Sequence, residues 1–384
     1  MEFEITAAEL ASLDKNSYIL IDIRDGVAFQ YGHIEGAVNI PQKELVEGGA
    51  LSELGKDKKL VICCKSGIIS QNTAELLREK GYDAYNLAGG YVDWLRRDME
   101  SREIAETTER VEKSIRKKFH KDIFSKFAKA VVEYDLIQPN DKIAVCISGG
   151  KDSMLMAKLF QEIQRHRKFS FETVFLVMDP GYSPENRNII EENAKALSVP
   201  ITVFESTIFD SVYNVEKNPC YLCARMRRGY LYSKAKELGC NKIALGHHFD
   251  DVIETILMGM LYGGQVQTMM PKLHSTNFEG MELIRPLYLV REEDIKHWRD
   301  YNRLHFIQCA CKFTDTCTAC NPANTGSKRQ EVKRLIAKLK ETNPQVEKNI
   351  FRSVENVNLH TVIAYKDSEG THNFLDGYDL VKGE

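Results

Sequence analysis

A cysteine at the end of a predicted strand is the first residue suited to chemistry. Residues 59–64 read KLVICC, and residues 65–70 (KSGIIS) lead into a predicted helix. Cys64 would therefore face backbone N–H groups and the positive end of a helix, which lower a thiol pKa and stabilise anionic sulfur. Cys63 should point to the other side of the strand. Cys64 is a candidate nucleophile or persulfide carrier, although its position suits a buried structural cysteine about equally well.

A glycine-rich turn between a predicted strand and a predicted helix is the second candidate. Residues 145–153 read VCISGGKDS. Glycines let the backbone approach a ligand, and their N–H groups form a nest for anions. Lys151 adds a positive charge for phosphate oxygens, and Asp152 could help to hold Mg²⁺. The spacing is not that of a Walker motif, so transfer of a terminal phosphate is not implied. The candidate binding residues of this turn are Ser148, Gly149, Gly150, Lys151, Asp152 and Ser153.

Closely spaced cysteines are the third candidate. The chain has ten cysteines, which in a reducing compartment favours metal binding or sulfur chemistry over disulfides. Two thiolates at C-x-x-C spacing can share a metal or a cluster, but one such pair alone could also be a redox pair or have no function. Several pairs in one domain argue against the last alternative. The pairs are Cys220 and Cys223, Cys309 and Cys311, and Cys317 and Cys320.

The elements that must position these residues alternate between strand and helix, which predicts α/β layers with parallel sheets. The predicted strands are residues 18–24, 59–64, 143–147, 173–178 and 242–245. The predicted helices are 71–80, a helix that begins at Ser153, and a long helix or pair of helices over 97–132. We predict four segments: a domain over 1–100, a helical linker over 101–135, a second domain over 136–345 and an extension over 346–384.

The composition sets outer limits on function. The 384 residues are 43% hydrophobic and 28% charged, as in globular proteins, and suffice for two domains. We see no apolar run long enough to cross a bilayer and no secretory signal, so we expect a cytoplasmic protein without a membrane partner. The net charge of −3 argues against a protein that coats nucleic acid, but it allows a local basic face that binds one folded RNA.

The first hundred residues resemble a single rhodanese domain. The matching pieces are residues 22–24 (DIR), 32–41 (GHIEGAVNIP), the Cys64 loop, and 87–90 (LAGG) followed by Trp94. The resemblance implies that Cys64 carries sulfane sulfur as a persulfide, and that Asp22 and Arg24 support the wall of the site. Ile69 stands where rhodanese loops usually have an arginine, which removes a contact to an anion such as thiosulfate. We therefore expect a persulfide donor protein, such as a cysteine desulfurase.

The turn at residues 148–153 (SGGKDS) resembles the signature of the PP-loop ATP-pyrophosphatases. The resemblance implies a Rossmann-like α/β domain of the adenine nucleotide α-hydrolase type, which cleaves ATP between the α- and β-phosphates and adenylates a substrate oxygen. It places Met178 near the adenine. The segment 245–251 (LGHHFDD) supplies Gly246, together with Asp250 and Asp251 as candidates for Mg²⁺ or substrate contacts. The two histidines of that segment could instead be packing residues.

Residues from about 119 to 339 resemble the tRNA 2-thiocytidine synthetases. The match runs through 220–232 (CYLCARMRRGYLY), 242–248 (KIALGHH), 261–264 (LYGG), 271–273 (PKL) and 284–287 (IRPL). The resemblance implies a 4Fe-4S cluster held by Cys220, Cys223 and a third cysteine, Cys311 or Cys309. It also implies tRNA, at its anticodon loop, as substrate. Zinc in place of the cluster, a cluster-free persulfide mechanism and assembly as a homodimer are left open.

These resemblances together predict an ATP-dependent tRNA sulfurtransferase that adenylates the C2 oxygen of a cytidine and replaces that oxygen with sulfur. The predicted catalytic residues are Cys64, Asp152, Cys220 and Cys223, with Arg225, Arg227 and Arg228 as candidates for RNA phosphates. One alternative is an AMP-forming ligase or synthetase for a small metabolite, in which the rhodanese domain is a redox regulator. A sulfur or redox sensor that binds ATP without catalysis is another.

Overall fold

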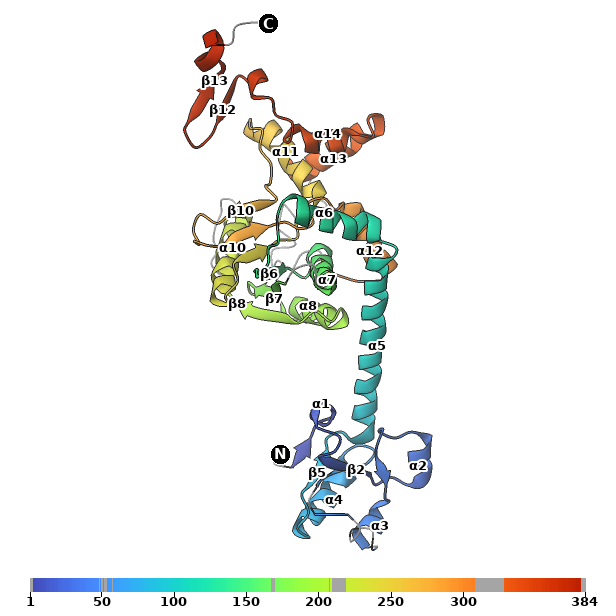
Figure 1. Ribbon diagram of the computed structural model, residues 1–384. Coiled ribbons are helices and arrows are strands. Elements are labelled where there is room, and N and C mark those ends of the chain that lie inside the picture. The colour runs from blue at the N-terminus through green and yellow to red at the C-terminus, as the bar shows by residue number, and fades with distance from the viewer. Residues whose placement is uncertain are drawn as a thin grey trace. The chain divides into compact units, whose positions relative to one another are not determined.

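The chain forms two compact units in this computed structural model, residues 1–106 and 107–384 (Figure 1). The structure describes residues 3–47, 49, 51, 54–56, 58–166, 170–206, 208, 219–307 and 328–380. Each unit is built around its own sheet, parallel apart from one edge strand of the second unit, which confirms the predicted fold class. No helix in the described ranges is long and apolar enough to cross a membrane.

The first unit has a five-stranded parallel sheet with the strand order β1-β5-β4-β2-β3. The strands are β1 (Glu4–Ile5), β2 (Tyr18–Asp22), β3 (Val38–Asn39), β4 (Lys59–Cys63) and β5 (Ala84–Leu87). The helices are α1 (Ala7–Ser12), α2 (Gly26–Tyr31), α3 (Gln42–Glu47) and α4 (Ile68–Glu79). Successive side chains along β4 point to opposite faces of the sheet. Leu60 and Ile62 pack with the α3 and α4 side, whereas Val61 and Cys63 pack with α1.

A single long helix, α5 (Gly90–Arg116), continues from the first unit into the second. It is followed by a π-helical turn, η2 (His120–Phe124), and by α6 (Ser125–Glu133). Apolar residues recur at helical spacing along this segment, and from Val111 onward they are buried in the core of the second unit: Val111, Ile115, Phe119, Ile123, Phe127 and Val131. The buried Lys158 ammonium lies 3.0 Å from a carboxylate oxygen of Glu112, which ties the end of α5 to that core. The segment predicted as a linker over 101–135 is thus shared between the two units.

The second unit has a six-stranded sheet with the strand order β10-β11-β9-β6-β7-β8. Its strands are β6 (Lys142–Ile147), β7 (Glu172–Asp179), β8 (Ile201–Glu205), β9 (Lys242–Ala244), β10 (Lys272–His274) and β11 (Glu282–Ile284). All pairs are parallel except β10 with β11, so the carboxyl ends of β6, β7, β9 and β11 meet at one edge. That edge is where ligands bind in open parallel sheets.

Helices cover both faces of this sheet. They are α7 (Lys151–Arg165), α8 (Pro184–Ala196), α10 (Pro219–Glu237), α11 (Phe249–Gly263), α12 (Glu292–Tyr301), α13 (Lys328–Thr342) and α14 (Val346–Ser353). Ile143 and Val145 of β6 pack with α7 and α8 on one face, whereas Ala144 and Cys146 pack with α10 on the other.

The predicted C-terminal extension begins with a helix that packs against the second unit. Phe351 of α14 is buried and stacks on Phe249, with 4.8 Å between ring centroids. Beyond α14 lie a short 3₁₀ turn, η3 (Leu359–Thr361), an antiparallel hairpin of β12 (Ala364–Lys366) and β13 (Thr371–Asn373), and a second turn, η4 (Phe374–Leu380).

Candidate sulfur-carrier and nucleotide-binding sites

Cys64 lies in a cradle of hydrogen-bond donors in the first unit. Its sulfur accepts hydrogen bonds from the Gly67 N–H (3.1 Å), the Ser70 N–H (3.4 Å) and the Ser70 hydroxyl (3.1 Å). Gly67 has a positive φ of 83°, and a Cβ there would lie 2.8 Å from the Gly89 nitrogen, so only glycine fits this turn. The loop is therefore shaped to surround the sulfur with N–H groups at the start of α4.

The two adjacent thiols have opposite chemistry. Burial raises the pKa of Cys64, but hydrogen bonds from the Ser70 hydroxyl and from the backbone of Ser70, Ser66 and Gly67 outweigh it, so the pKa is lowered. Burial raises the pKa of Cys63 to about 12. The predicted difference between the two cysteines thus has a clear physical cause: Cys64 favours the thiolate, and Cys63 stays protonated.

Asp22 and Arg24 form a rigid pair next to this loop. The Arg24 guanidinium donates to both Asp22 carboxylate oxygens (2.9 and 2.6 Å) and to the Gly32 carbonyl (2.7 Å), and it lies 4.0 Å from the centre of the Tyr91 ring. Tyr91 in turn donates its N–H to the Cys64 carbonyl (2.8 Å). Arg24 therefore supports the loop by its contacts, and its Nε and one terminal nitrogen are engaged within the protein.

The loop itself presents apolar side chains to solvent. Ile68 and Ile69 are 69% and 52% exposed, and among the loop residues 65–70 only Lys65 carries a positive charge. An anionic donor such as thiosulfate finds little electrostatic attraction here.

The glycine turn of the second unit follows β6 and starts α7. Gly149 has a φ of 83°, and a Cβ there would lie 2.5 Å from the Ile190 side chain. The Ser153 hydroxyl accepts from the Ser148 N–H (3.1 Å), and the two hydroxyls lie 3.2 Å apart. Gly150 is the N-cap of α7 and has no side chain that could accept from the first N–H groups of the helix, which are the groups that bind anions at helix N-termini.

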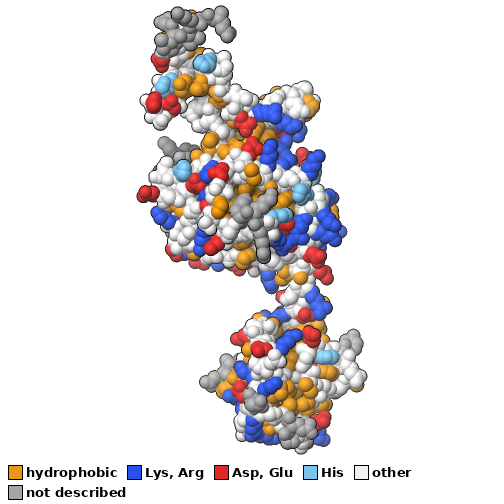
Figure 2. Space-filling view, viewed as in Figure 1, with side chains coloured by type: hydrophobic (Ala, Val, Ile, Leu, Met, Phe, Trp, Pro, Cys, Tyr) orange, Lys and Arg blue, Asp and Glu red, His pale blue; other side chains and the backbone are white. Residues whose placement is uncertain are grey.

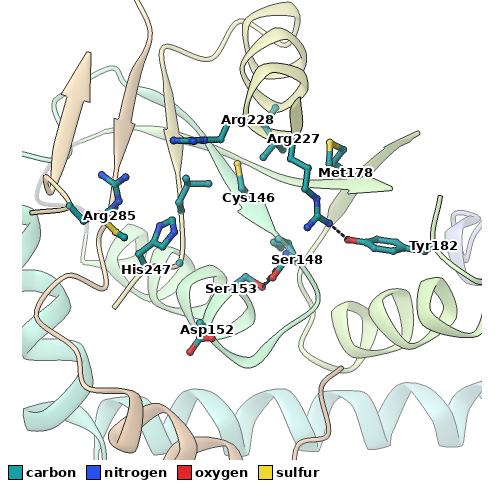
Figure 3. Close-up of a pocket in the computed structure, with 15 residues that line it drawn as sticks. Cys146, Ser148, Asp152, Ser153, Met178, Tyr182, Arg227, Arg228, His247 and Arg285 are labelled. Carbon is teal, nitrogen blue, oxygen red and sulfur yellow. Dashed lines mark hydrogen bonds between the residues drawn. The ribbon is translucent and has the colours of Figure 1, made fainter. Parts of the chain in front are cut away.

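A cavity of about 490 Å³ opens above this turn, a size suited to a nucleotide (Figure 3). The predicted residues that line it are Ser148, Asp152, Ser153, Met178 and Gly246. The Oδ1 atom of Asp152 is buried and has no hydrogen-bond partner among the residues that the structure describes, which fits an oxygen ligand for Mg²⁺. His247 also lines the cavity, and burial lowers its pKa, so the ring is neutral at pH 7.

Three predicted residues, Lys151, Asp250 and Asp251, lie beside the cavity in an ion-pair network. The Lys151 ammonium lies 3.1 Å from Asp152 and 3.3 Å from Glu292. Asp250 accepts from Arg291 (3.1 Å) and from the Glu292 N–H (2.7 Å), which caps α12.

Asp251 has local partners at the start of α11. It accepts from the His248 N–H (3.1 Å) and lies 3.4 Å from Arg329. Burial raises its pKa, but the charges of His248 and Arg329 outweigh that effect and lower it. Both carboxylates are thus engaged by protein partners, and their role toward Mg²⁺ stays a prediction.

Three arginines that were not predicted to line the cavity also lie in its wall. Arg285 follows β11, while Arg227 and Arg228 reach the cavity from α10; Arg227 donates to the Tyr182 hydroxyl (3.1 Å). Arg285 could not be singled out, because the strand before it has only three residues and shows no periodicity. Cys146 also lines the cavity, but burial raises its pKa to about 12, so it is a neutral thiol.

The predicted cluster ligands fall largely outside the described residues. Cys220 and Cys223 lie in the first turn of α10, ahead of Arg227 in the same helix, but their side chains are not among the described ones. Cys309, Cys311, Cys317 and Cys320 lie outside the described residues. Within the described part of the chain, no group of three or more His, Cys, Asp or Glu side chains is arranged for a metal.

A parallel sheet with a glycine turn, an open helix N-terminus and a cavity at its carboxyl edge defines an α/β nucleotide-binding protein. Comparison with known families agrees. Residues 6–97 match the rhodanese-like domain, and residues 116–313 match the PP-loop domain.

Comparison with individual proteins narrows this class of nucleotide-binding proteins further. The tRNA-cytidine(32) 2-sulfurtransferase of Anaeromyxobacter dehalogenans is 33% identical over 263 residues, which cover 66% of this chain and 87% of the relative. That of Citrifermentans bemidjiense is 34% identical over 61% of this chain and 90% of its own length. The chain therefore belongs to the PP-loop family and, within it, to the family of the tRNA-cytidine(32) 2-sulfurtransferases. All three resemblances seen in the sequence are confirmed.

A solved structure is also similar in fold. The U34-tRNA thiolase NcsA from Methanococcus maripaludis, determined with its 4Fe-4S cluster, has a TM-score of 0.48 and 21% identity, over 68% of this chain and 88% of that one.

Proposed function

We propose that the chain is an ATP-dependent tRNA sulfurtransferase that thiolates a cytidine at C2, with Cys64 as the sulfur carrier. The proposal is carried by one observation: a chain of this family holds a cysteine of lowered pKa in a donor-lined loop and a nucleotide-sized cavity at a PP-loop turn. The relatives are named for cytidine 32 of tRNA, which lies in the anticodon loop, and we assign the same substrate to this chain.

Adenylation is the first step. The adenine lies near Met178, and the phosphates lie on the turn 148–153, with Asp152 as the Mg²⁺ ligand. A cytidine enters the cavity unstacked. Its C2 oxygen attacks the α-phosphorus, and the bond to pyrophosphate breaks. Lys151 leaves Glu292 to contact the phosphates, while Glu292 keeps Lys333 (2.5 Å) and Lys296 (3.1 Å) as partners.

Sulfur replaces the activated oxygen in the second step. A sulfur nucleophile attacks C2, the C2–O bond breaks, and AMP leaves. Because the outer sulfur of a persulfide is at the level of elemental sulfur, release of the thiolated base requires two electrons, which we assign to an external thiol. Cys64 receives its sulfur from a persulfide donor protein of the cysteine desulfurase class, since the apolar loop at Ile69 disfavours thiosulfate.

The cysteines at the start of α10 are the proposed holders of a 4Fe-4S cluster. Cys220, Cys223 and either Cys311 or Cys309 form a thiolate set of the kind that holds such clusters, and the same set would also suit zinc. When bound, the cluster would offer an iron site for sulfur. Metal analysis and an absorption spectrum after anaerobic purification distinguish the two metals.

Basic side chains are available for the RNA backbone. Figure 2 shows Lys and Arg side chains gathered on the second unit toward α12 and α13. The basic residues of α13 are Lys328, Arg334 and Lys338, together with Arg329, Lys333 and Lys340, which form ion pairs with carboxylates. Phosphate contacts of this kind position an RNA, while the cavity selects the base.

Action on tRNA also implies a place in the cytoplasm.

The test compares sulfur donors in a Cys64→Ala variant. Thiolation of tRNA, measured by mass spectrometry of nucleosides, should survive with inorganic sulfide and fail with a persulfide donor. The neighbouring Cys63→Ala variant is the matched control and should use both donors. Lys151→Ala should lose thiolation with either donor. A Cys64→Ala protein as active as the wild type with the persulfide donor would refute the carrier role.

A further inference from the structure

Arg285 is a buried cation at the wall of the cavity. It directly follows β11, and its side chain is 5% exposed. One terminal nitrogen donates to the Met270 carbonyl, but Nε is buried and has no hydrogen-bond partner among the described residues. A buried guanidinium that leaves a donor unused costs free energy, so its retention needs a reason.

No carboxylate in the described ranges forms an ion pair with Arg285 or with Arg228. Asp251 acts on Arg285 electrostatically, yet its ion pairs are with His248 and Arg329. Burial lowers the pKa of Arg285 to about 10, so the side chain remains charged at neutral pH. Arg228 adds a second positive charge next to it. The two arginines therefore create a positive region at the cavity without a counter-ion from the described part of the protein.

The sheet order separates this region from the nucleotide turn. Along the edge of the sheet, Met178 is the penultimate residue of β7, Ser148 follows β6, His247 follows β9 and Arg285 follows β11. In Figure 3, Arg228 extends from α10 toward the side where His247 and Arg285 lie, whereas Met178 and Tyr182 lie on the other side. A nucleotide with its adenine at Met178 and its phosphates at the turn thus leaves the Arg285 end for a second substrate.

We propose that Arg285 and Arg228 form a phosphate subsite that binds a backbone phosphate next to the nucleotide that enters the cavity. A guanidinium presents paired donors that match two phosphate oxygens, and the unused Nε–H of Arg285 is such a donor. The subsite would hold the target nucleotide after it leaves the RNA stack. This inference rests on the proposed function, because it takes RNA as the second substrate.

The test measures binding of two ligands to the full-length protein. Arg285→Met and Arg228→Met should each weaken binding of an unmodified anticodon stem–loop RNA about tenfold. Each should also reduce the slope of log Kd against log salt by about 1. Binding of ATP should be unchanged. Lys236→Met, which removes one exposed charge from α10 outside the cavity, is the control and should match the wild type.

A neutral linkage in the RNA identifies the phosphate. Stem–loops with a single methylphosphonate on either side of the target cytidine should bind the wild type about tenfold more weakly at one position. The same linkage should not weaken RNA binding to the Arg285→Met variant any further, because that variant has already lost the contact. Arg228 is exposed, so its variant supplies the same comparison should Arg285→Met not fold.

The outcomes are distinct. Weaker ATP binding with unchanged RNA binding would show that the arginines serve the nucleotide, and the subsite for RNA would be wrong. Additive effects of the neutral linkage and Arg285→Met would equally overturn it. If the wild type fails to bind the stem–loop at all, the proposed function fails first. A lower thermal stability of Arg285→Met with loss of both ligands would assign a structural role instead.

Discussion

At the scale of single residues, two adjacent cysteines differ because of the atoms that surround each sulfur. Cys64 accepts three hydrogen bonds, and Cys63 packs among apolar side chains on the opposite face of the sheet. The Ser70 hydroxyl also lies 2.7 Å from the Asn86 side-chain oxygen, yet it has a single proton to donate. A thiolate is the stronger acceptor of the two, so ionisation of Cys64 should draw that proton to the sulfur.

The first prediction follows from this hydroxyl. Ser70→Ala should raise the pKa of Cys64, since a donor to the thiolate is lost while burial remains. The thiolate would then form only at higher pH, and alkylation of Cys64 by iodoacetamide should slow at neutral pH and recover at alkaline pH. Thr73→Val removes a hydroxyl one turn further along α4 and should not move the pH profile. An unchanged profile in Ser70→Ala would show that the hydroxyl does not lower the pKa of Cys64.

The second prediction concerns the choice of sulfur donor. Ile69 is half exposed at the start of α4, so an arginine there can reach an anion without disturbing the core. Ile69→Arg should increase the rate of sulfur transfer from thiosulfate to cyanide about tenfold, by adding a charge-assisted contact. Leu76→Arg places the same charge at an exposed position two turns along α4 and should have no effect. An equal gain in the rate in both variants would show that the added positive charge increases the rate wherever it lies on α4.

At the scale of elements, the starts of α7, α11 and α12 are joined by ion pairs. Arg291 contacts Asp250 of α11 (3.1 Å) and Glu347 of α14 (2.5 Å), while Glu292 of α12 contacts Lys151 of α7 (3.3 Å). Asp250 also caps α12 through the Glu292 N–H. These contacts hold the helix that carries the phosphate turn in place against its neighbours. Asp250 is thus a positioning residue by its contacts, whatever it does toward Mg²⁺.

The third prediction separates these two roles. Asp250→Ala should lower the unfolding free energy of the second unit by about 2 kcal/mol, because α12 loses its cap and Arg291 loses a partner. This free energy is measured by urea unfolding in the presence of a chelator, without ATP or Mg²⁺. The fluorescence of Trp298 in a Trp94→Phe background follows the unfolding. Glu293→Gln changes an exposed carboxylate in the same turn of α12 and should leave the unfolding free energy unchanged. Equal stability of Asp250→Ala and the wild type would leave only a ligand role.

At the scale of the whole molecule, the two units share one continuous helix, α5. Each unit has its own sheet and core, so the proposed sulfur carrier and the proposed nucleotide site are built independently. A covalent connection raises the effective concentration of the carrier near the acceptor.

The fourth prediction tests that connection by mixing two inactive full-length chains. Cys64→Ala lacks the carrier, and Lys151→Ala lacks the phosphate contact. With a persulfide donor, the mixture should regain activity that rises with protein concentration and stays well below the wild type in dilute solution. Full recovery at high dilution would instead indicate transfer between the chains of a stable dimer, and size-exclusion chromatography would then show that dimer.

Much of the fold could be predicted from the sequence, because buried strands and glycine turns are local patterns. The strands at 143–147 and 173–178 were each found to within a residue or two, since their runs of apolar and β-branched residues leave no alternative. The helix predicted to begin at Gln71 starts at Ile68, because the left-handed Gly67 before it sets the boundary. The short strands β10 and β11 escaped prediction, since three residues show no period.

The sequence alone determined the chemistry that this chain can perform, since the cysteine loop and the run SGGKDS place the required groups within a few consecutive residues. The tertiary structure decided which charged side chains pair with one another inside the protein. Lys151 meets Glu292 across about 140 positions of sequence, and the Arg285 Nε has no partner in the described part of the chain. Ion pairing depends on distance in space, which spacing along the chain does not encode. Burial, which also depends on the whole fold, keeps Cys63 protonated, while the hydrogen bonds of the folded loop favour the thiolate of its neighbour.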